Sequence, residues 1–309
     1  MKQLLPCLLF LVGLQISGHA QSAYELPESV KKILFLGNSI TWSGEYVDYV
    51  ETYFRAIKPG QSLEFINVGL PSETVSGLSE PNHAEGKFPR PDLHERLSRV
   101  LTATEPDLVI ACYGMNDGIY LPFDETRFSK FKEGIVWLHE EVINEDIPII
   151  HITPPIFDER KGAAYANVLD IYADWLISRR YTADWNVIDI HWPMRKYLEE
   201  QRLTDSTFVL AEDGVHPNST GHWLMAKEIL LYLGEQEVAS ADSIEETLSS
   251  FQNVDKLLRL VGERQEVLRN AWLTHTGHKR PGLPEGISVT KAKRKAKHID
   301  KKLAKLVRR

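Results

Sequence analysis

The chain has 309 residues and a formal net charge of −7, and its composition is ordinary for a soluble globular protein. This length is enough for one α/β domain with a large core plus appendages, and the composition excludes a disordered or low-complexity chain. The charge is unevenly spread, because residues 279–309 carry twelve lysines and arginines against two acidic residues, a net +10, which leaves −17 for the rest.

The first twenty residues have the features of a secretory signal. Lys2 supplies a positive start, residues 4–14 are apolar, and residues 17–20 are mostly small. We therefore expect cleavage after Ala20 and export to the periplasm or out of the cell, with an uncleaved anchor as the alternative. The apolar run is too short for an ordinary membrane span. Cleavage would leave Cys112 as the single cysteine, so no internal disulfide is expected.

The first predicted strand, residues 33–37, is uncharged and mostly large and apolar, as expected for a strand covered on both faces of a parallel sheet. It ends at Gly37, and a helix is predicted for residues 45–57. Further strands and helices alternate along the chain: strands at 63–68, 107–113, 148–152 and 185–190, helices at 93–104, 125–145, 164–180 and 220–233, and a helix-containing connection at 191–211. This alternation predicts an α/β fold with parallel strands and right-handed crossovers.

Beyond residue 234 the pattern becomes helical. Apolar residues at three- and four-residue spacing predict one long amphipathic helix at 244–272, and a linker at 276–286 leads to a basic helix at 292–306. We expect the apolar face of this basic helix to dock on the acidic body, with its lysines solvated. Binding of nucleic acid, anionic glycan or a membrane is the alternative. The predicted organisation is a signal peptide (1–20), an α/β domain (21–235) and a helical extension with a basic tail (236–309).

Four loops at the expected carboxyl edge of the sheet carry residues that suit acyl transfer. They contain Ser39, Gly69, Asn116 and the pair formed by Asp213 and His216. Open α/β sheets bind their ligands at this edge. One ring nitrogen of the histidine can donate to the aspartate, so that the other nitrogen can face the serine hydroxyl. This is the arrangement of a nucleophile, a base and an orienting acid in acyl-transfer enzymes.

These loops contain four short motifs in chain order: Gly37-Asn38-Ser39-Ile40, Gly69, Gly114-Met115-Asn116-Asp117 and Asp213-Gly214-Val215-His216-Pro217. Over residues 31–233 the chain thereby resembles the SGNH, or GDSL-like, hydrolase family. The resemblance implies a three-layer α/β/α sandwich with a five-stranded parallel sheet of flavodoxin-like type for residues 21–235. It also implies that Ser39 is the nucleophile, His216 the base and Asp213 its orienting acid. The amides of Ser39, Gly69 and Asn116 would form the oxyanion hole.

Four residues near the expected site are candidates for contacts with substrate. Asn38 stands where many members of the family carry aspartate. Glu73 and Arg90 belong to the long connection of residues 70–90, which leaves the carboxyl edge of the sheet and is predicted to form one wall of the site. Tyr120 follows the Asn116 motif. The alternative interpretation is that these are solvated loop side chains without a role in binding.

The resemblance implies a serine esterase that works through an acyl-serine intermediate, with no metal and no other cofactor. Export, polar loops and the carbohydrate esterases of the family favour an O-acetyl group on a sugar or polysaccharide as the substrate. A lipase, lysophospholipase or thioesterase is the alternative enzyme, and a catalytically inactive glycan-binding module is the alternative of another class. We expect a small-molecule or polysaccharide ester as the partner, no nucleic acid and no stable membrane insertion. The oligomeric state stays open.

Overall fold

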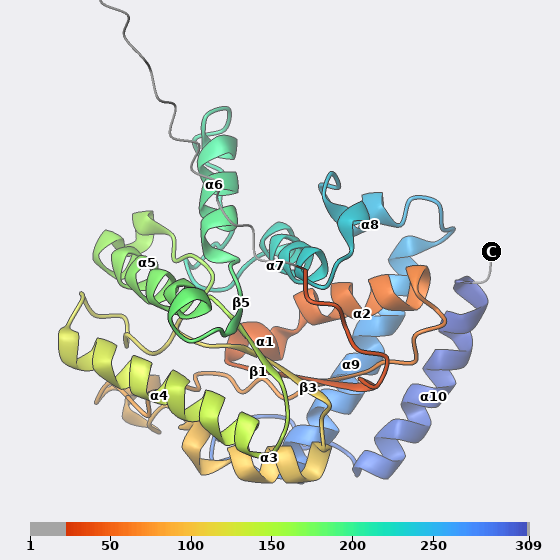
Figure 1. Cartoon of the computed structure of the whole chain (residues 1–309), viewed down its shortest axis with the longest axis horizontal. Coiled ribbons are helices and arrows are strands. Elements are labelled where there is room, and N and C mark those ends of the chain that lie inside the picture. The colour runs from red at the N-terminus through yellow and green to blue at the C-terminus, as the bar shows by residue number, and fades with distance from the viewer. Residues whose placement is uncertain (1–22, 308–309) are drawn as a thin grey trace, which may run out of the picture.

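A computed structural model describes residues 23–307 of the chain (Figure 1). The predicted signal segment, residues 1–20, lies outside this described part. Within residues 23–307, no helix combines the length and the apolar character that a membrane span requires.

The centre of the fold is a five-stranded sheet in the order β2-β1-β3-β4-β5, in which every neighbouring pair is parallel. Its strands are β1 Lys32–Gly37, β2 Glu64–Asn67, β3 Leu108–Cys112, β4 Ile149–Ile152 and β5 Asn186–Ile188. Apart from the first residues of β1, β2 and β5, all strand residues are buried, which explains why the strands read as continuous apolar runs. The predicted five-stranded parallel α/β fold is confirmed.

Helices cover both faces of the sheet. They are α1 Ser39–Ser43, α2 Glu45–Ile57, α3 Leu97–Thr104, α4 Glu125–Asn144, α5 Glu159–Thr182, α6 His191–Arg202 and α7 Ser219–Tyr232, with 3-10 turns at η1 His83–Gly86, η2 Leu93–Glu95 and η3 Gln236–Val238. Helices α2 and α7 pack against each other on one side of the sheet, and α4 and α5 lie on the opposite side (Figure 1). This gives the three layers that the alternation of strands and helices predicts.

The C-terminal extension differs from the prediction in one respect. The expected single helix at 244–272 is wrong, because the structure has two helices, α8 Ile244–Thr247 and α9 Val254–Thr276. Asn253 adopts a left-handed conformation with φ of 60°, which an α-helix cannot contain, so a new helix starts directly after it. The basic helix is α10 Val289–Leu306.

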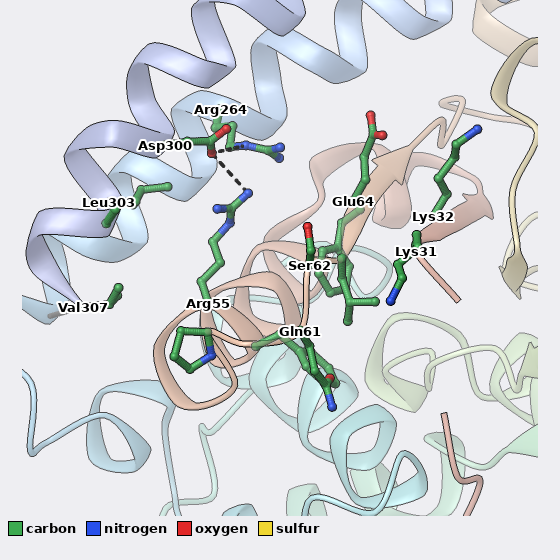
Figure 2. Close-up of a pocket in the computed structure, with 15 residues that line it drawn as sticks. Lys31, Lys32, Arg55, Gln61, Ser62, Glu64, Arg264, Asp300, Leu303 and Val307 are labelled. Carbon is green, nitrogen blue, oxygen red and sulfur yellow. Dashed lines mark hydrogen bonds and ion pairs between the residues drawn. The ribbon is translucent and has the colours of Figure 1, made fainter. Parts of the chain in front are cut away.

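The extension packs closely against the α/β core. Helix α9 lies on α2 and β2, and α10 lies on α9 through buried alanine and leucine side chains, while most of its lysines are exposed. Figure 2 shows how Asp300 of α10 joins Arg264 of α9 to Arg55 of α2, at 2.8 and 3.2 Å. These residues line a groove of about 670 Å³ at the amino-terminal edge of the sheet, opposite the edge that carries Ser39.

Candidate active site

Ser39 is presented at the carboxyl end of β1 by a turn that only glycine can begin. A Cβ atom on Gly37 would lie 2.1 Å from Oγ1 of Thr41 and 2.8 Å from the carbonyl oxygen of Cys112. The next residue, Asn38, caps α1, because its Oδ1 accepts from the amide of Ile40 at 3.0 Å. Ser39 is then the first residue of α1.

The loop before α7 brings an imidazole and a carboxylate to this serine. Nε2 of His216 lies 2.8 Å from Oγ of Ser39, and Nδ1 of the same ring lies 2.6 Å from Oδ2 of Asp213. Oδ1 of Asp213 accepts from the amides of Val215 and His216, at 2.8 Å each. The aspartate therefore holds both the ring and the backbone of the loop.

These hydrogen bonds also set the charge of Asp213. Partial burial raises the pKa of its carboxyl, but the hydrogen bonds from His216 and Val215 outweigh burial and lower the pKa below its ordinary value. An ionised Asp213 accepts from Nδ1, which leaves Nε2 without a proton and able to accept one from the Ser39 hydroxyl. His216 thus links Asp213, three residues before it, to Ser39, 177 residues before it, through one hydrogen bond from each ring nitrogen.

Asn116 is fixed by two neighbours in the orientation of an amide donor. Its Nδ2 donates to the carbonyl of Glu73 at 3.0 Å, and its Oδ1 accepts from the hydroxyl of Tyr120 at 3.1 Å. An amide nitrogen carries two hydrogens, so the second one remains for a ligand. The surrounding loop is tied by buried Asp117, which accepts from the amides of Gly114 and Val75 at 2.9 Å each.

Gly69 has a packing role that the sequence analysis did not predict. Its amide donates to Oδ1 of Asn67 at 2.9 Å, so the hydrogen expected in the oxyanion hole is already used. A Cβ atom at this position would lie 2.3 Å from the backbone nitrogen of Trp42, which means that glycine is needed for close contact with α1. The structure therefore corrects the predicted role of Gly69.

Ser72, three residues further on, is a site residue that sequence reasoning missed. It has a φ of 70°, which is rare for a residue with a side chain. Among the described residues its amide has no hydrogen-bond partner, while the carbonyl of the next residue, Glu73, holds Asn116. A glycine at this position would have drawn attention to a left-handed turn, but a serine does not.

Two of the four predicted substrate contacts point into the protein. The Asn38 side chain is buried, with its Oδ1 committed to the cap of α1. The Glu73 side chain is completely buried and accepts from Nε and Nη2 of Arg96 at 2.6 and 2.7 Å, and from the hydroxyl of Tyr113 at 2.7 Å. Neither side chain can reach a bound ligand, so both predictions are corrected.

Arg90 and Tyr120 lie beside the site but are partly engaged. Arg90 is largely buried and donates to both carboxylate oxygens of Glu80 at 2.7 Å, and its guanidinium lies 5.3 Å from the ring centre of Tyr120. The Tyr120 hydroxyl donates to Asn116. Of the four candidates, Tyr120 is thus the one whose side chain contacts the side chain of Asn116.

A parallel α/β sandwich that carries a hydrogen-bonded serine, histidine and aspartate at the carboxyl edge of its sheet is a serine hydrolase by architecture. The comparison with known families agrees. Residues 35–224 match the model of the GDSL-like Lipase/Acylhydrolase family, and the chain belongs to that family. It is an SGNH-type esterase, an enzyme that hydrolyses carboxylic esters.

Individual relatives share the fold at low sequence identity. The chain is 25% identical to an acetylxylan esterase of Geobacillus stearothermophilus over 237 residues, which cover 69% of this chain and 98% of the relative. A crystal structure of the acetylxylan esterase Axe2 from that organism has a TM-score of 0.52 at 23% identity, covering 66% of this chain and 94% of the other. A gut microbial diltiazem-metabolizing enzyme, BT4096, has a TM-score of 0.54 at 20% identity and covers 69% of this chain, which spans 48% of that protein.

Proposed function

We propose that the protein removes O-acetyl groups from a carbohydrate through an acyl-serine intermediate formed on Ser39. The observation that carries this proposal is the continuous hydrogen-bonded path from the hydroxyl of Ser39 through His216 to Asp213, at 2.8 and 2.6 Å. Each link has the donor and acceptor that acyl transfer requires.

The reaction has two steps. Oγ of Ser39 attacks the ester carbonyl while Nε2 of His216 takes the hydroxyl proton, and the same nitrogen then protonates the leaving sugar hydroxyl as the C–O bond breaks. A water molecule next attacks the acetyl-serine, His216 takes its proton, and acetate leaves as the proton returns to Ser39. Asp213 holds the ring and stabilises the positive imidazolium that forms in both steps.

The negative oxygen of each tetrahedral intermediate needs donors that are in place beforehand. We assign this role to the amides of Ser39 and Ser72 and to the free Nδ2 hydrogen of Asn116, with Ser72 in place of Gly69. The unpartnered amide of Ser72 and the fixed orientation of Asn116 support this assignment. One such donor contributes roughly 3–4 kcal/mol of transition-state stabilisation.

Two observations favour a short acyl group on a sugar. The Asp213 and His216 side chains are about half exposed, 54% and 50%, which suits an ester attached to a bulky polar polymer. The Geobacillus relative is an acetylxylan esterase, and its catalytic mutants replace one serine, one aspartate and one histidine, the last two three residues apart as in Asp213 and His216.

The test is acetate release from a panel of acetylated oligosaccharides, acetylated xylooligosaccharides included, together with the hydrolysis of p-nitrophenyl acetate and palmitate. We expect acetate release, a preference for the acetate ester, and labelling by a fluorophosphonate that is lost in Ser39→Ala. A preference for palmitate would favour the lipase alternative. Folded wild-type protein that takes no label would favour the inactive glycan-binding module.

We also propose that residues 1–20 direct export and are removed after Ala20. The arrangement of a positive start, an apolar core and small residues supports this. N-terminal sequencing of protein recovered from the periplasm or the medium of an expressing cell should begin at Gln21. Recovery of protein with its first residues intact in the membrane fraction would support the uncleaved anchor instead.

A further inference from the structure

Helix α1 carries Ser39 but cannot be stable by itself. It has five residues, far below the length at which an isolated helix forms in water. The last four carbonyls of any helix lack partners within it, and in α1 these are the carbonyls of residues 40–43. The Ile40 carbonyl accepts from the amide of Gly44 and from the hydroxyl of Ser43. The other three depend on side chains from elsewhere in the protein or on water.

Two distant side chains provide these partners. Nδ2 of Asn67, the last residue of β2, donates to the carbonyl of Thr41 at 2.6 Å. Nη1 of Arg269 on α9 donates to the carbonyl of Trp42 at 2.5 Å and contacts that of Ser43 at 3.4 Å. Arg269 therefore serves the exposed end of α1 from a helix that lies outside the segment matched by the family model.

The guanidinium of Arg269 also has an aromatic ring and two acidic side chains as neighbours. It lies 4.6 Å from the ring centre of Trp42, within the range of a cation–π contact. The charged groups that face it are Asp48 of α2 and Glu266 of its own helix. Burial raises the pKa of Asp48 well above its ordinary value, and no hydrogen bond joins Arg269 to Asp48 within residues 23–307. In this part of the chain Nε of Arg269 has no hydrogen-bond partner, so Nη1 is the atom that joins the guanidinium to α1.

Helix α9 is itself fixed to the core one turn before Arg269. Arg264 donates to buried Glu51 of α2 at 2.9 Å, and Gln265 donates to the carbonyl of Phe65 in β2 at 3.1 Å. A rigid support is what a positioning side chain needs, because a small displacement of a reacting group costs much of the rate.

We infer that Arg269 is a positioning residue that connects the C-terminal extension to the active site by holding α1, and with it Ser39, in place. This rests on the proposed role of Ser39 as nucleophile. The extension then completes the active site without contacting substrate, and a protein that ends at residue 235 would lack this support.

The experiment compares Arg269→Met with the full-length wild type by hydrogen–deuterium exchange and by kinetics. The matched control is Arg259→Met, the same change on the same helix at an exposed arginine that pairs with Glu263. We expect exchange of the peptide covering residues 38–45 to rise roughly 10-fold or more in Arg269→Met, the effect of losing one charged hydrogen bond, with β3 unchanged. We expect kcat to fall about 10- to 100-fold with little change in KM. Arg269→Lys, which keeps the charge, should restore part of both.

Unchanged exchange at residues 38–45 in folded Arg269→Met would overturn the inference, as would a rise spread equally over β3 and α2. If Arg269→Met does not fold, Arg269→Lys is compared with Arg259→Lys by the same two criteria. The exchange measurement needs no substrate. Failure of the wild type to release acetate or take the fluorophosphonate would therefore count against the proposed function alone, while the exchange result still decides the role of Arg269.

Discussion

Replacing Glu73 with glutamine should destabilise the fold strongly without weakening substrate binding. The Glu73 carboxylate and the Arg96 guanidinium are 0 and 1% exposed, and two hydrogen bonds of 2.6 and 2.7 Å join them. Glu73→Gln leaves the arginine charge buried without a counter-charge, which costs roughly 3–5 kcal/mol. Since a domain of this kind has about 5–15 kcal/mol of stability in total, a fifth or more of it would be lost.

Urea unfolding followed by circular dichroism measures this loss as a lower midpoint at an unchanged slope. Glu263→Gln is the control, because Glu263 pairs with Arg259 at 2.6 Å while both side chains are about half exposed, and its loss should cost at most about 1 kcal/mol. The double variant Glu73→Leu/Arg96→Met removes both charges and should recover at least half of the lost stability. If Glu73→Gln unfolds at the same urea concentration as the wild type and instead raises KM, the structural role of Glu73 is refuted. The prediction that Glu73 contacts substrate would then be supported.

Three further predictions concern single side chains. Asn116→Ala should lower kcat by roughly 10²–10³ with KM within a few-fold, in steady-state assays with p-nitrophenyl acetate; an unchanged kcat would remove it from the oxyanion hole. Asp213→Asn should lower kcat by roughly 10⁴ in a folded protein, because the ring of His216 would then carry its proton on the wrong nitrogen; a loss under tenfold would contradict this. Burial, with the charge of Asp189, raises the pKa of Glu228 to about 7 from an ordinary 4.5, so the native state keeps a proton that the unfolded chain releases. Burial lowers the pKa of His139, His151 and His222, and these groups add stability as pH rises toward 6.5. The effect of Glu228 is therefore the difference in urea-unfolding free energy between the wild type and Glu228→Gln, which should shift against the wild type as pH rises from 4.5 to 7; a difference that stays constant over this range would contradict it.

The sheet could be predicted from the sequence because its signal is local. Each strand is a short run of buried apolar residues, and the helices between them begin at residues that favour caps. Asp124 and Asn218, for example, cap α4 and α7 by accepting from the amides of Arg127 and Gly221. In each of these contacts the two partners are three residues apart, so both can be recognised in one short segment of the sequence.

The residues of the candidate site were predictable to the extent that their chemistry is unusual in a loop. An aspartate and a histidine three residues apart at a helix start, together with Ser39 after a strand, have few purely structural explanations.

The roles of Glu73 and Gly69, in contrast, could not be predicted from the sequence. A glutamate in a polar loop looks solvated until its partner, Arg96, is known, and that partner lies 23 residues further along the chain. A glycine at the end of a strand suggests close contact with a ligand. The structure shows that Gly69 is instead needed for close contact with the backbone of Trp42, which the sequence does not reveal.

Helix α1 shows the same limit in backbone structure. Nothing in residues 39–43 predicts a stable helix, because two of the side chains that complete it, Asn67 and Arg269, come from β2 and α9. The amphipathic pattern of the extension shows that one face of its helices is buried, but it does not identify the surface that covers this face. The answer depends on Glu51, a buried side chain of α2 that accepts from Arg55 of its own helix and from Arg264 and Gln265 of α9. The buried carboxylate takes one counter-charge from Arg55 of α2 and a second from Arg264 of the extension. The packing of the core therefore continues across a boundary placed at residue 235.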